Sequence, residues 1–245
     1  MNRTLVSREN IGTVPSSIRS YLKGAQIYDS SCSEQAQTLY IEGTERLFLK
    51  ISKKGTLERE RAMTNFLHCH KLAPQVIAFD SDKDKDYLLL EALDGVDGTA
   101  EIHRKHPDQL AGALGGYLRK LHELPLSGCP FPERTAELIG EMTDKGISAD
   151  DLDEFGYIPE DRVVIHGDYC LPNVIIMDHF ELQGFIDLGS GGIGDRHYDI
   201  YWGLWTLRYN FNTERLEDLF LDAYGRQDVD PDGLRYFAKL VELTD

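Results

Sequence analysis

Three oxygen-bearing side chains lie close together in the stretch VVIHGDYCLPNVIIMDHFELQGFIDLG, residues 163–189. Asp168 follows a His-Gly pair, Asn173 comes five residues later, and Asp187 a further fourteen. Asp and Asn oxygens are hard ligands that suit Mg²⁺, which usually shares its coordination shell with phosphates. Phosphoryl transfer uses such a metal, together with a carboxylate that orients and deprotonates the attacking hydroxyl. The spacing therefore predicts Asp168 as the catalytic base and Asn173 and Asp187 as metal ligands.

Each of these residues also has an ordinary structural interpretation. A Gly-Asp pair usually makes a turn, an Asn beside a proline usually caps one, and an Asp after a strand often begins a helix. The joint pattern H-G-D-x4-N followed by I-D-x-G is much more specific than its parts. Within it, we expect His166 to support the turn rather than act as an acid or base. We expect Cys170 to be packed rather than nucleophilic.

A second pair of charged residues lies earlier in the chain. Lys50 is the cation of the apolar run LFLKI, and Glu60 comes ten residues later in a predicted helix, from which it could reach back to the lysine. A kinase needs a cation on the nucleotide phosphates, held in place by an acid. The alternative is an exposed lysine and a helical charge pattern in ERER. Residues 24–40 contain a single glycine, so a Gly-rich phosphate loop is missing, and the Ser-rich turn at 30–33 is its candidate substitute.

The elements that must position Lys50 and Glu60 belong to residues 1–93. Short runs rich in β-branched and aromatic residues, separated by polar turns, predict an antiparallel arrangement of strands at 26–28, 38–42, 46–52, 76–80 and 86–92. Apolar spacing and Ser/Pro start signals predict helices at 15–23 and 56–70. A linker is expected at 93–98, where two glycines lie in a polar stretch.

Helices dominate the prediction for residues 94–245, which carry the Asp168 motif. A single apolar stripe predicts a helix at 107–124, and further helices are expected at 133–145, 149–155, 199–209, 214–224 and 231–243. Between them, the apolar runs VVIH, NVIIM and GFIDL predict three short strands that carry polar residues at their ends. Trp202 and Trp205 fall in one of these helices, and we expect them to be core residues rather than a platform for a substrate.

The charge of the chain is strongly uneven. Its 245 residues have a net charge of −16; residues 1–93 carry 13 Lys+Arg and 12 Asp+Glu, and residues 94–245 carry 13 Lys+Arg and 30 Asp+Glu. A part with a net charge of −17 would attract and concentrate cations. Acidic residues also serve solubility alone, so both interpretations stay open. A chain this acidic is a poor candidate for binding nucleic acid, whose affinity depends on cations that meet phosphates.

Other features of the sequence bear on where the protein acts. No run of about 18 apolar residues is present, so no membrane-spanning helix is predicted. The N-terminal MNRTLVSREN lacks the apolar region of a signal peptide. The cysteines at 32, 69, 129 and 170 form no CxxC and no metal-ligand spacing. We therefore expect free thiols in a reducing cytoplasm, and nothing in the sequence indicates an obligate protein partner.

The motifs HGDYCLPN and GFIDLGSGGIGDRHYDI resemble those of the aminoglycoside phosphotransferases, most closely the 3′-phosphotransferase branch, which are relatives of the eukaryotic-type protein kinases. The resemblance runs through essentially the whole chain and is densest from 162 to 202. It implies an α+β, bilobal protein-kinase-like fold, with a nucleotide-binding lobe at 1–93 and a catalytic, substrate-binding lobe at 94–245. It also implies ATP or GTP as the donor, Mg²⁺, and transfer of the γ-phosphoryl group to a hydroxyl, such as the 3′-OH, of a cationic aminoglycoside antibiotic, which would give resistance.

Roles for individual residues follow from the same resemblance. Asp168 corresponds to the base, Asn173 and Asp187 to the metal ligands, and Lys50 and Glu60 to the phosphate-binding pair. The resemblance also assigns Phe48 to stacking on adenine, the backbone from Glu91 to Leu93 to pairing with the base, and Asp199 to supporting the fold after the metal loop.

The substrate-binding region departs from the family pattern. Well-known drug-modifying members carry an acidic pair on the helix after the DI motif, and here the corresponding positions are Tyr209 and Asn210. Those members also end in Asp-Glu-Phe/Leu-Phe, whereas this chain ends VELTD, in which Glu242 keeps its acid and Asp245 is a substitute. The region 133–160 is shorter than in the family but acidic, which makes further substrate-binding candidates of Asp150, Asp151, Asp153 and Glu154.

Two other classes of function remain open from the sequence. A kinase of the same fold could act on a different small amino-alcohol or sugar metabolite, as choline, amino-sugar and ketosamine kinases do, and the loss of acids at 209 and 210 favours this alternative. A nucleotide-binding module without activity, or a metal-dependent hydrolase built on H-x-D, is the third class. A hydrolase has no use for a Lys50–Glu60 pair, and an inactive module could have lost one of the five polar residues that are all present.

Overall fold

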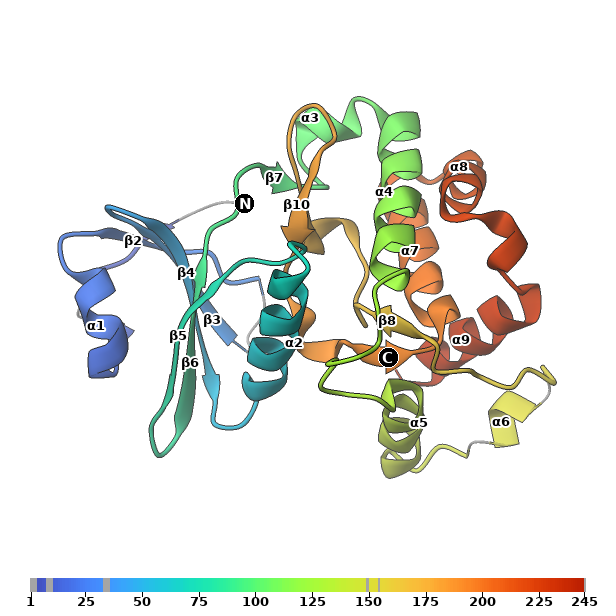
Figure 1. The fold of residues 1–245 in the computed structure, drawn as a ribbon, viewed down its shortest axis with the longest axis horizontal. Helices are drawn as coiled ribbons and strands as arrows, with labels where there is room; N and C mark the ends of the chain where they lie inside the picture. Colours follow the sequence, from blue (N-terminus) through green and yellow to red (C-terminus); the bar gives the residue numbers. More distant parts are fainter. Residues whose placement is uncertain (1–3, 8–10, 33–35, 149, 154, 245) are drawn as a thin grey trace. The chain divides into compact units, whose positions relative to one another are not determined.

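The computed structural model describes residues 4–7, 11–32, 36–148, 150–153 and 155–244, and at positions 151 and 153 it describes the backbone alone. The chain divides into two compact units, Met1–Leu93 (unit 1) and Asp94–Asp245 (unit 2). Unit 1 contains the blue to blue-green strands of Figure 1, and unit 2 contains the green to red helices. The predicted α+β class, with an N-terminal antiparallel sheet and a mainly helical C-terminal part, is confirmed.

The described part of unit 1 is built on a six-stranded antiparallel sheet in the order β1-β2-β3-β4-β6-β5. Its strands are β1 (Thr4–Leu5), β2 (Gln26–Asp29), β3 (Ala36–Glu42), β4 (Arg46–Lys53), β5 (Val76–Ser81) and β6 (Lys85–Glu91). The two helices of this part are α1 (Ser16–Leu22) and α2 (Glu58–Cys69). Apart from β1, which was not predicted, each of these elements was expected within three residues of its observed ends.

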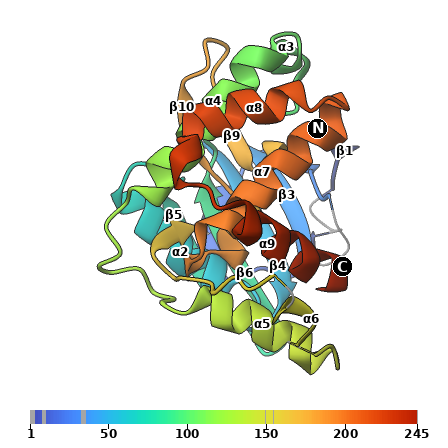
Figure 2. The ribbon, with the colours of Figure 1, turned by 90° about the vertical axis from the view of Figure 1, so that its right-hand side faces the viewer.

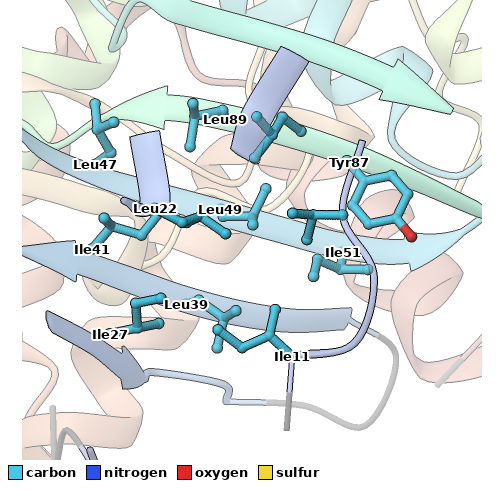
Figure 3. Packing of buried hydrophobic residues seen from close by; sticks show 12 residues of the cluster. Ile11, Leu22, Ile27, Leu39, Ile41, Leu47, Leu49, Ile51, Tyr87 and Leu89 are labelled. Carbon is cyan, nitrogen blue, oxygen red and sulfur yellow. The ribbon is translucent and has the colours of Figure 1, made fainter. Parts of the chain in front are cut away.

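The period-two alternation of β4 decides which side chains meet which helix. Leu47, Leu49 and Ile51 are buried, and they belong to a cluster that also contains Ile18 and Leu22 of α1. Figure 3 shows this cluster on one face of the sheet, with side chains from β2, β3, β4 and β6 pointing into it. Because neighbouring side chains of a strand point to opposite faces, Phe48 and Lys50 must lie on the other face.

That other face of the sheet packs beneath α2. Leu88 and Leu90 of β6 form a buried cluster there with Leu57, which directly precedes the helix. The fully buried Asp86 accepts hydrogen bonds from the backbone N–H groups of Gly55 (2.7 Å) and Leu57 (3.1 Å) and from the Ser81 hydroxyl (2.7 Å). An acid that accepts from backbone N–H groups at the start of a helix fixes where the helix begins. Asp86 therefore sets the position of α2, and with it that of Glu60.

Unit 2 is organised around packed helices. They are α3 (Glu101–Arg104), α4 (Pro107–His122), α5 (Arg134–Asp144), α6 (Asp150–Asp153), α7 (Arg196–Phe211), α8 (Arg215–Tyr224) and α9 (Pro231–Thr244). Figures 1 and 2 show α4 and α8 side by side, with α7 beside them. A Cβ added to Gly115 of α4 would lie 2.2 Å from the carbonyl oxygen of Phe220 in α8, so the absence of a side chain there lets these helices approach closely.

Short strands of unit 2 carry the polar motif. In its described residues, β7 (Val96–Asp97), β9 (Val174–Ile176) and β10 (Leu182–Phe185) form a three-stranded sheet, and β8 (Val163–Ile165) pairs with β11 (Gly192–Gly194). Short 3-10 helices lie at Leu171–Asn173, Leu188–Ser190 and Arg226–Asp228. The strands expected from VVIH, NVIIM and GFIDL are thereby confirmed, whereas β11 and α3 were not predicted.

The predicted linker at 93–98 is wrong in its second half. Val96 and Asp97 form β7 and pair with Ile176 and Ile175 of β9. The glycines that suggested a flexible linker serve close packing instead, because a Cβ on Gly95 would lie 2.6 Å from the carbonyl oxygen of Ile176. The backbone after the first unit is therefore held inside unit 2 by strand pairing.

Candidate functional site

Asp168 lies in the turn after β8, and two neighbours hold its carboxylate. The amide Nδ2 of Asn173 donates to Asp168 Oδ2 at 2.8 Å and to the Asp168 carbonyl at 3.0 Å. The thiol of Cys170 donates to Asp168 Oδ1 at 3.3 Å. Burial and the nearby charge of Asp168 raise the pKa of the Cys170 thiol, so it remains protonated and can act as a donor. The carboxylate is thus oriented within a half-buried turn, and Cys170 is packed, as predicted.

His166 and Gly167 give this turn its shape. The fully buried His166 accepts at Nδ1 from the Asp168 N–H at 3.2 Å, and its Nε2 lies 3.0 Å from the carbonyl oxygen of Ile186. Burial lowers the pKa of His166, so the neutral ring with its proton on Nε2 satisfies both contacts. Gly167 has φ +84°, and a Cβ there would lie 2.0 Å from the carbonyl oxygen of Ser190. His166 supports the turn, as predicted, and the glycine is required for it.

The helix α7 lies against the turn and holds its backbone. Asp199, fully buried, accepts from the backbone N–H groups of His166 at 2.6 Å and Gly167 at 2.8 Å. About two turns later, the Thr206 hydroxyl accepts from the Leu171 N–H at 3.3 Å. His122 of α4 supports Asp199 in turn, with Nε2 at 3.3 Å from its carboxylate. The turn that carries Asp168 is therefore attached to α7 at both of its ends.

Asn173 and Asp187 are brought together by strand pairing. Val174 pairs with Phe185, and the N–H of Ile186 donates to the Asn173 carbonyl at 3.0 Å, so Asp187 follows directly beside Asn173. Asp187 is exposed and has φ +59°, in the left-handed region that Asp tolerates better than most residues. One amide and one carboxylate oxygen donor fit Mg²⁺, which takes few protein ligands and completes its octahedron from phosphates and water. In the described part of the chain, no three His, Cys, Asp or Glu side chains gather as metal ligands would.

In unit 1, Lys50 and Glu60 form an ion pair. The Nζ of Lys50 lies 2.6 Å from Glu60 Oε1, with side chains 14% and 8% exposed. The pair joins the middle of β4 to the first turn of α2, ten residues along the chain. Because water screens a pair this enclosed only weakly, its geometry holds the lysine amine in one place.

Phe48 lies on the same sheet face as Lys50, next to an aromatic neighbour. Its ring centroid is 5.2 Å from that of Tyr40, which is 6.1 Å from that of Tyr28. The N–H of Glu91 donates to the Gln75 carbonyl at 3.0 Å, within the sheet. The adenine-stacking role of Phe48 and the base-pairing role of the Glu91–Leu93 backbone stay predictions.

The predicted substrate-binding residues are scattered through unit 2 in several states. Tyr209 is 75% exposed, whereas the Nδ2 of Asn210 donates to the Thr206 carbonyl within its own helix at 2.8 Å. Glu242 is exposed and 3.3 Å from the amine of Lys239, and Asp150 is exposed in α6. Glu154, Asp245 and the side chains of Asp151 and Asp153 lie outside the described residues. The substrate-binding roles of all these residues stay predictions.

Several supporting residues were not found from the sequence. Thr206 and His122 hold the turn through α7, and the Arg134 Nε donates to the Ser190 carbonyl at 2.9 Å, opposite Gly167. Asp195 caps α7 by accepting from the His197 N–H at 2.9 Å. Only Asp195 had a usable signal, because an Asp directly before a helical stretch is a common cap. The others lie 35 to 77 residues away from the group they hold, so no local pattern marks them.

A comparison with protein families assigns most of the chain. Residues 33–237 match the model of the family described as the phosphotransferase enzyme family, APH. The chain belongs to this family. It is a phosphotransferase, similar to the aminoglycoside 3′-phosphotransferases: a probable aminoglycoside 3′-phosphotransferase of Lactococcus lactis is 37% identical over 247 residues, which cover 93% of this chain and 94% of the relative.

Solved structures of phosphotransferases share the fold. An aminoglycoside 3′-phosphotransferase of type VIII superposes with a TM-score of 0.74 at 23% identity, over 94% of this chain and all of the other. The aminoglycoside phosphotransferase APH(3″)-Id from Streptomyces rimosus, in complex with ADP and streptomycin, superposes with a TM-score of 0.68 at 23% identity, over 85% of this chain and 90% of the other. None of the helices in the described part of this phosphotransferase has the length and hydropathy that a bilayer crossing requires.

Proposed function

We propose that the protein uses ATP and Mg²⁺ to phosphorylate a hydroxyl of an aminoglycoside, the 3′-hydroxyl, and thereby gives resistance to such antibiotics in the cytoplasm. The observation that carries the proposal is the turn 166–173, in which an Asp carboxylate is oriented by an Asn side chain beside a second Asp. Identity of 37% to a probable aminoglycoside 3′-phosphotransferase supports the acceptor class. A relative of the same fold in complex with ADP and streptomycin supports an adenine nucleotide and a cationic, hydroxylated acceptor.

Asp168 would take the proton of the attacking hydroxyl. Both of its oxygens accept hydrogen bonds from neutral donors, Asn173 and Cys170, which orient the carboxylate without neutralising its charge. An ionised carboxylate keeps lone pairs for a further donor, so it can accept a hydrogen bond from the substrate hydroxyl and then its proton. His166 does not compete for this role, because both of its ring nitrogens are engaged with backbone groups.

Asn173 and Asp187 would hold Mg²⁺ through their side-chain oxygens. A bound magnesium would neutralise charge that develops on the transferring phosphoryl group. The chain's own contribution is to keep the two donors adjacent through the pairing of Val174 with Phe185 and the Ile186–Asn173 hydrogen bond. The amide of Asn173 thus has two functions in this proposal: its nitrogen orients Asp168 and its oxygen serves the metal.

Lys50 would bind the phosphates of the nucleotide, and Phe48 would stack on the adenine. The ion pair with Glu60 orients the amine of Lys50, and an amine has further protons to donate to phosphate oxygens. Phe48 lies two residues before Lys50 on the same face of β4, so one stretch of strand would contact both ends of one nucleotide. Charged groups of residues 94–245, with their net charge of −17, would attract the cationic acceptor.

A second candidate acceptor is a smaller amino-alcohol or sugar metabolite. The observation that favours it is the replacement of an acidic pair by Tyr209, which is exposed, and Asn210, which bonds to its own helix. Solved choline and ethanolamine kinases share the fold, but at 13–15% identity this similarity supports the fold alone and does not indicate the substrate. An experiment must therefore distinguish an aminoglycoside acceptor from a smaller amino-alcohol or sugar acceptor.

The test measures ADP release and product structure with Mg·ATP and a panel of acceptors. Kanamycin B and tobramycin form the decisive pair, because tobramycin lacks the 3′-hydroxyl of kanamycin B. We expect turnover of kanamycin B, no turnover of tobramycin, and a phosphate on the 3′-oxygen by ³¹P and ¹H NMR. Turnover of both compounds would contradict the 3′-hydroxyl, and turnover of choline or ethanolamine alone would establish the second candidate. GTP in place of ATP tests the choice of nucleotide, and the Asp168→Asn variant is the control for contaminating kinases.

A further inference from the structure

Two aromatic side chains of α7 lie stacked and exposed on its surface. The rings of Trp205 and Tyr209 are nearly parallel, at 11°, with centroids 5.0 Å apart. Trp205 is 41% exposed and Tyr209 is 75% exposed. Other large apolar side chains exposed in the described part of the chain include Leu126, Ile158 and Tyr21, at 36%, 83% and 37%, and they come from separate segments. An exposed stack of two large rings leaves apolar area in water, which another molecule could cover.

The stacked rings of Trp205 and Tyr209 pack on aromatic residues that extend into the core of unit 2. Trp202 meets Trp205 edge to face at 5.5 Å, and it meets Tyr198 edge to face at 6.4 Å. Tyr198 in turn packs on Phe237 of α9, inside a buried cluster. The spacing 198, 202, 205 and 209 places all four rings along one side of a helix. Half-buried Trp202 and buried Tyr198 thus hold the exposed rings in place, so the protein loses little side-chain entropy when a ligand contacts them.

The stack flanks the part of α7 that carries the catalytic turn. Asp199 and Thr206 accept hydrogen bonds from the backbone at both ends of that turn. At 3.6 residues per turn, the stripe of rings lies about a quarter-turn, roughly 90°, around the helix from these two residues. Because a single rigid helix carries both, the stack and the Asp168 turn keep a constant relation to each other. Binding of one molecule at both places would require an acceptor that reaches from Asp168 along α7 to the rings.

The net charge of the unit that carries the stack favours a cation as its ligand. Residues 94–245 have a net charge of −17. Arg208, in the same helical turn as the stack, does not oppose this, because both of its guanidinium contacts go to the two oxygens of Glu217 at 2.8 and 2.9 Å. An aromatic face attracts ammonium groups and also packs against the C–H faces of sugar rings.

We propose that Trp205 and Tyr209 form an aromatic platform that binds an amino-substituted sugar ring of the acceptor through cation–π and C–H contacts. The platform replaces recognition by acidic side chains at this position of α7 and determines which acceptors are used. This inference rests on the proposed function, since it names the acceptor subsite of the same reaction. It assigns Trp205 and Tyr209 to substrate binding and gives them no part in the chemical step.

The experiment compares Trp205→Ala/Tyr209→Ala with the wild type in steady-state kinetics with kanamycin B. We expect the KM for kanamycin B to rise on the order of tenfold, with the KM for ATP and kcat within about twofold. Trp205→Phe keeps an aromatic face and should retain most of the affinity. Tyr21→Ala, which removes an exposed tyrosine from α1, is the matched control and should change neither constant. Circular dichroism and thermal melting of each variant verify that it is folded.

A binding measurement without a phosphoryl donor separates failure of the platform from failure of the proposed function. The chain has two tryptophans, so kanamycin B should change the fluorescence of Trp205 in the wild type and have little effect in Trp205→Phe, where Trp202 remains. This result would support the platform even if no acceptor were phosphorylated. Normal turnover with an unchanged KM in the double alanine variant would overturn the platform and leave the function intact. Absence of both turnover and a fluorescence change would overturn both proposals. A wild-type dimer that the double variant dissociates would show that a second copy covers the rings, which also overturns the platform.

Discussion

At the scale of single residues, the chemistry of the proposed site depends on a few oriented polar groups. Asp168 is held by two neutral donors, and Lys50 is held by one acid. Asp168 therefore keeps its negative charge available for a proton, and Lys50 keeps spare N–H donors for phosphates. Removing a reactive group should change turnover or nucleotide affinity, and removing either member of the enclosed ion pair should also change stability.

We expect Asp168→Asn to lower kcat by about 10²–10⁴-fold with little change in the KM for ATP. Asparagine is nearly isosteric and can still accept from Asn173 through its oxygen, but it cannot take a proton from a hydroxyl. Steady-state kinetics with the acceptor in excess measure the effect, with nucleotide affinity measured separately by calorimetry. A variant that loses ATP binding while its turnover survives would contradict the role of Asp168 as the base.

We expect Lys50→Met to raise the KM for ATP at least about tenfold and to destabilise the protein, because Glu60 would be left enclosed without its cation. The double variant Lys50→Met/Glu60→Gln should recover much of the stability while the KM for ATP remains high. Urea unfolding and ATP titrations measure the two effects, and Lys53→Met, an exposed lysine of the same strand, is the control. Recovery of ATP affinity in the double variant would exclude a phosphate-binding role for Lys50.

At the scale of elements, the turn 166–173 is positioned by parts of the chain distant in sequence. Asp199 and Thr206 of α7 accept from its backbone, His122 of α4 supports Asp199, and the segment at Ser190 packs against Gly167. The turn contains few apolar side chains of its own, so its conformation is stabilised by these neighbours. A change in how they approach should therefore affect both stability and activity.

We expect Gly167→Ala to lower the free energy of unfolding by at least about 2 kcal/mol, because the residue has φ +84° and a Cβ would meet the Ser190 backbone at 2.0 Å. The control is Gly116→Ala in α4, where a Cβ meets nothing within 4 Å, and helix propensity should raise stability by about 0.5–1 kcal/mol. Thermal and urea unfolding measure both variants. Equal stability of Gly167→Ala and the wild type would show that the backbone of the turn can move away from Ser190 without a loss of free energy of unfolding.

At the scale of the whole molecule, two features of charge have measurable consequences. Burial lowers the pKa of both His122 and His166, which favours the neutral ring in the folded protein. The acidic residues are concentrated in residues 94–245, whereas residues 1–93 are nearly neutral. The first feature links folding to pH, and the second links acceptor binding to ionic strength.

We expect stability to fall as the pH decreases from about 7.5 toward 5.5. A histidine with a lowered pKa in the folded state binds fewer protons there than in the unfolded state. Its contribution to stability is therefore complete above the unfolded pKa of about 6.5. Below that pH the contribution is lost, at up to about 1.4 kcal/mol per pH unit. Asp178 and Glu181 raise the pKa of exposed His179, so its effect on stability changes with pH in the opposite direction. Hydrogen bonds from His197 and Tyr157 outweigh burial and lower the pKa of Asp195, whose contribution is lost only near pH 4 or below.

Urea unfolding at four pH values measures this dependence, and His122→Gln is the informative variant. It removes one buried titrating group while keeping a side chain that can hydrogen-bond, so its stability should vary less steeply with pH than that of the wild type. Identical slopes in the two proteins, or a wild type that becomes more stable at pH 5.5, would contradict the burial of neutral histidines.

We expect the KM for a polycationic acceptor to rise with ionic strength. The screening length falls from about 10 Å at 0.1 M salt to about 3 Å at 1 M, so attraction by the net charge of −17 on residues 94–245 should weaken. Initial rates with kanamycin B at increasing KCl measure the effect, and sucrose at matched osmolality is the control. A KM that is independent of salt would exclude long-range attraction as a source of affinity.

The sequence was sufficient for what depends on local patterns. Runs of β-branched and aromatic residues located the strand that carries Lys50, helical spacing located α4 and α7 to α9, and the joint spacing of Asp168, Asn173 and Asp187 indicated phosphotransferase chemistry. Such patterns are readable because strand and helix periodicities relate residues that are near in sequence. The roles of these residues stay predictions until the variants are measured.

Only the tertiary structure shows which groups hold the turn 166–173 and which side chains of α7 are exposed beside it. Thr206, His122 and Arg134 meet their partners across 35 to 77 residues of chain, and Gly95, expected in a linker, allows a strand to pair closely. The prediction that Trp205 is a core residue was wrong, since its side chain is 41% exposed and an aromatic residue in a helix suits either position. Exposure depends on which other elements cover a face, and that is settled when the helices pack, not by the order of residues within any one of them.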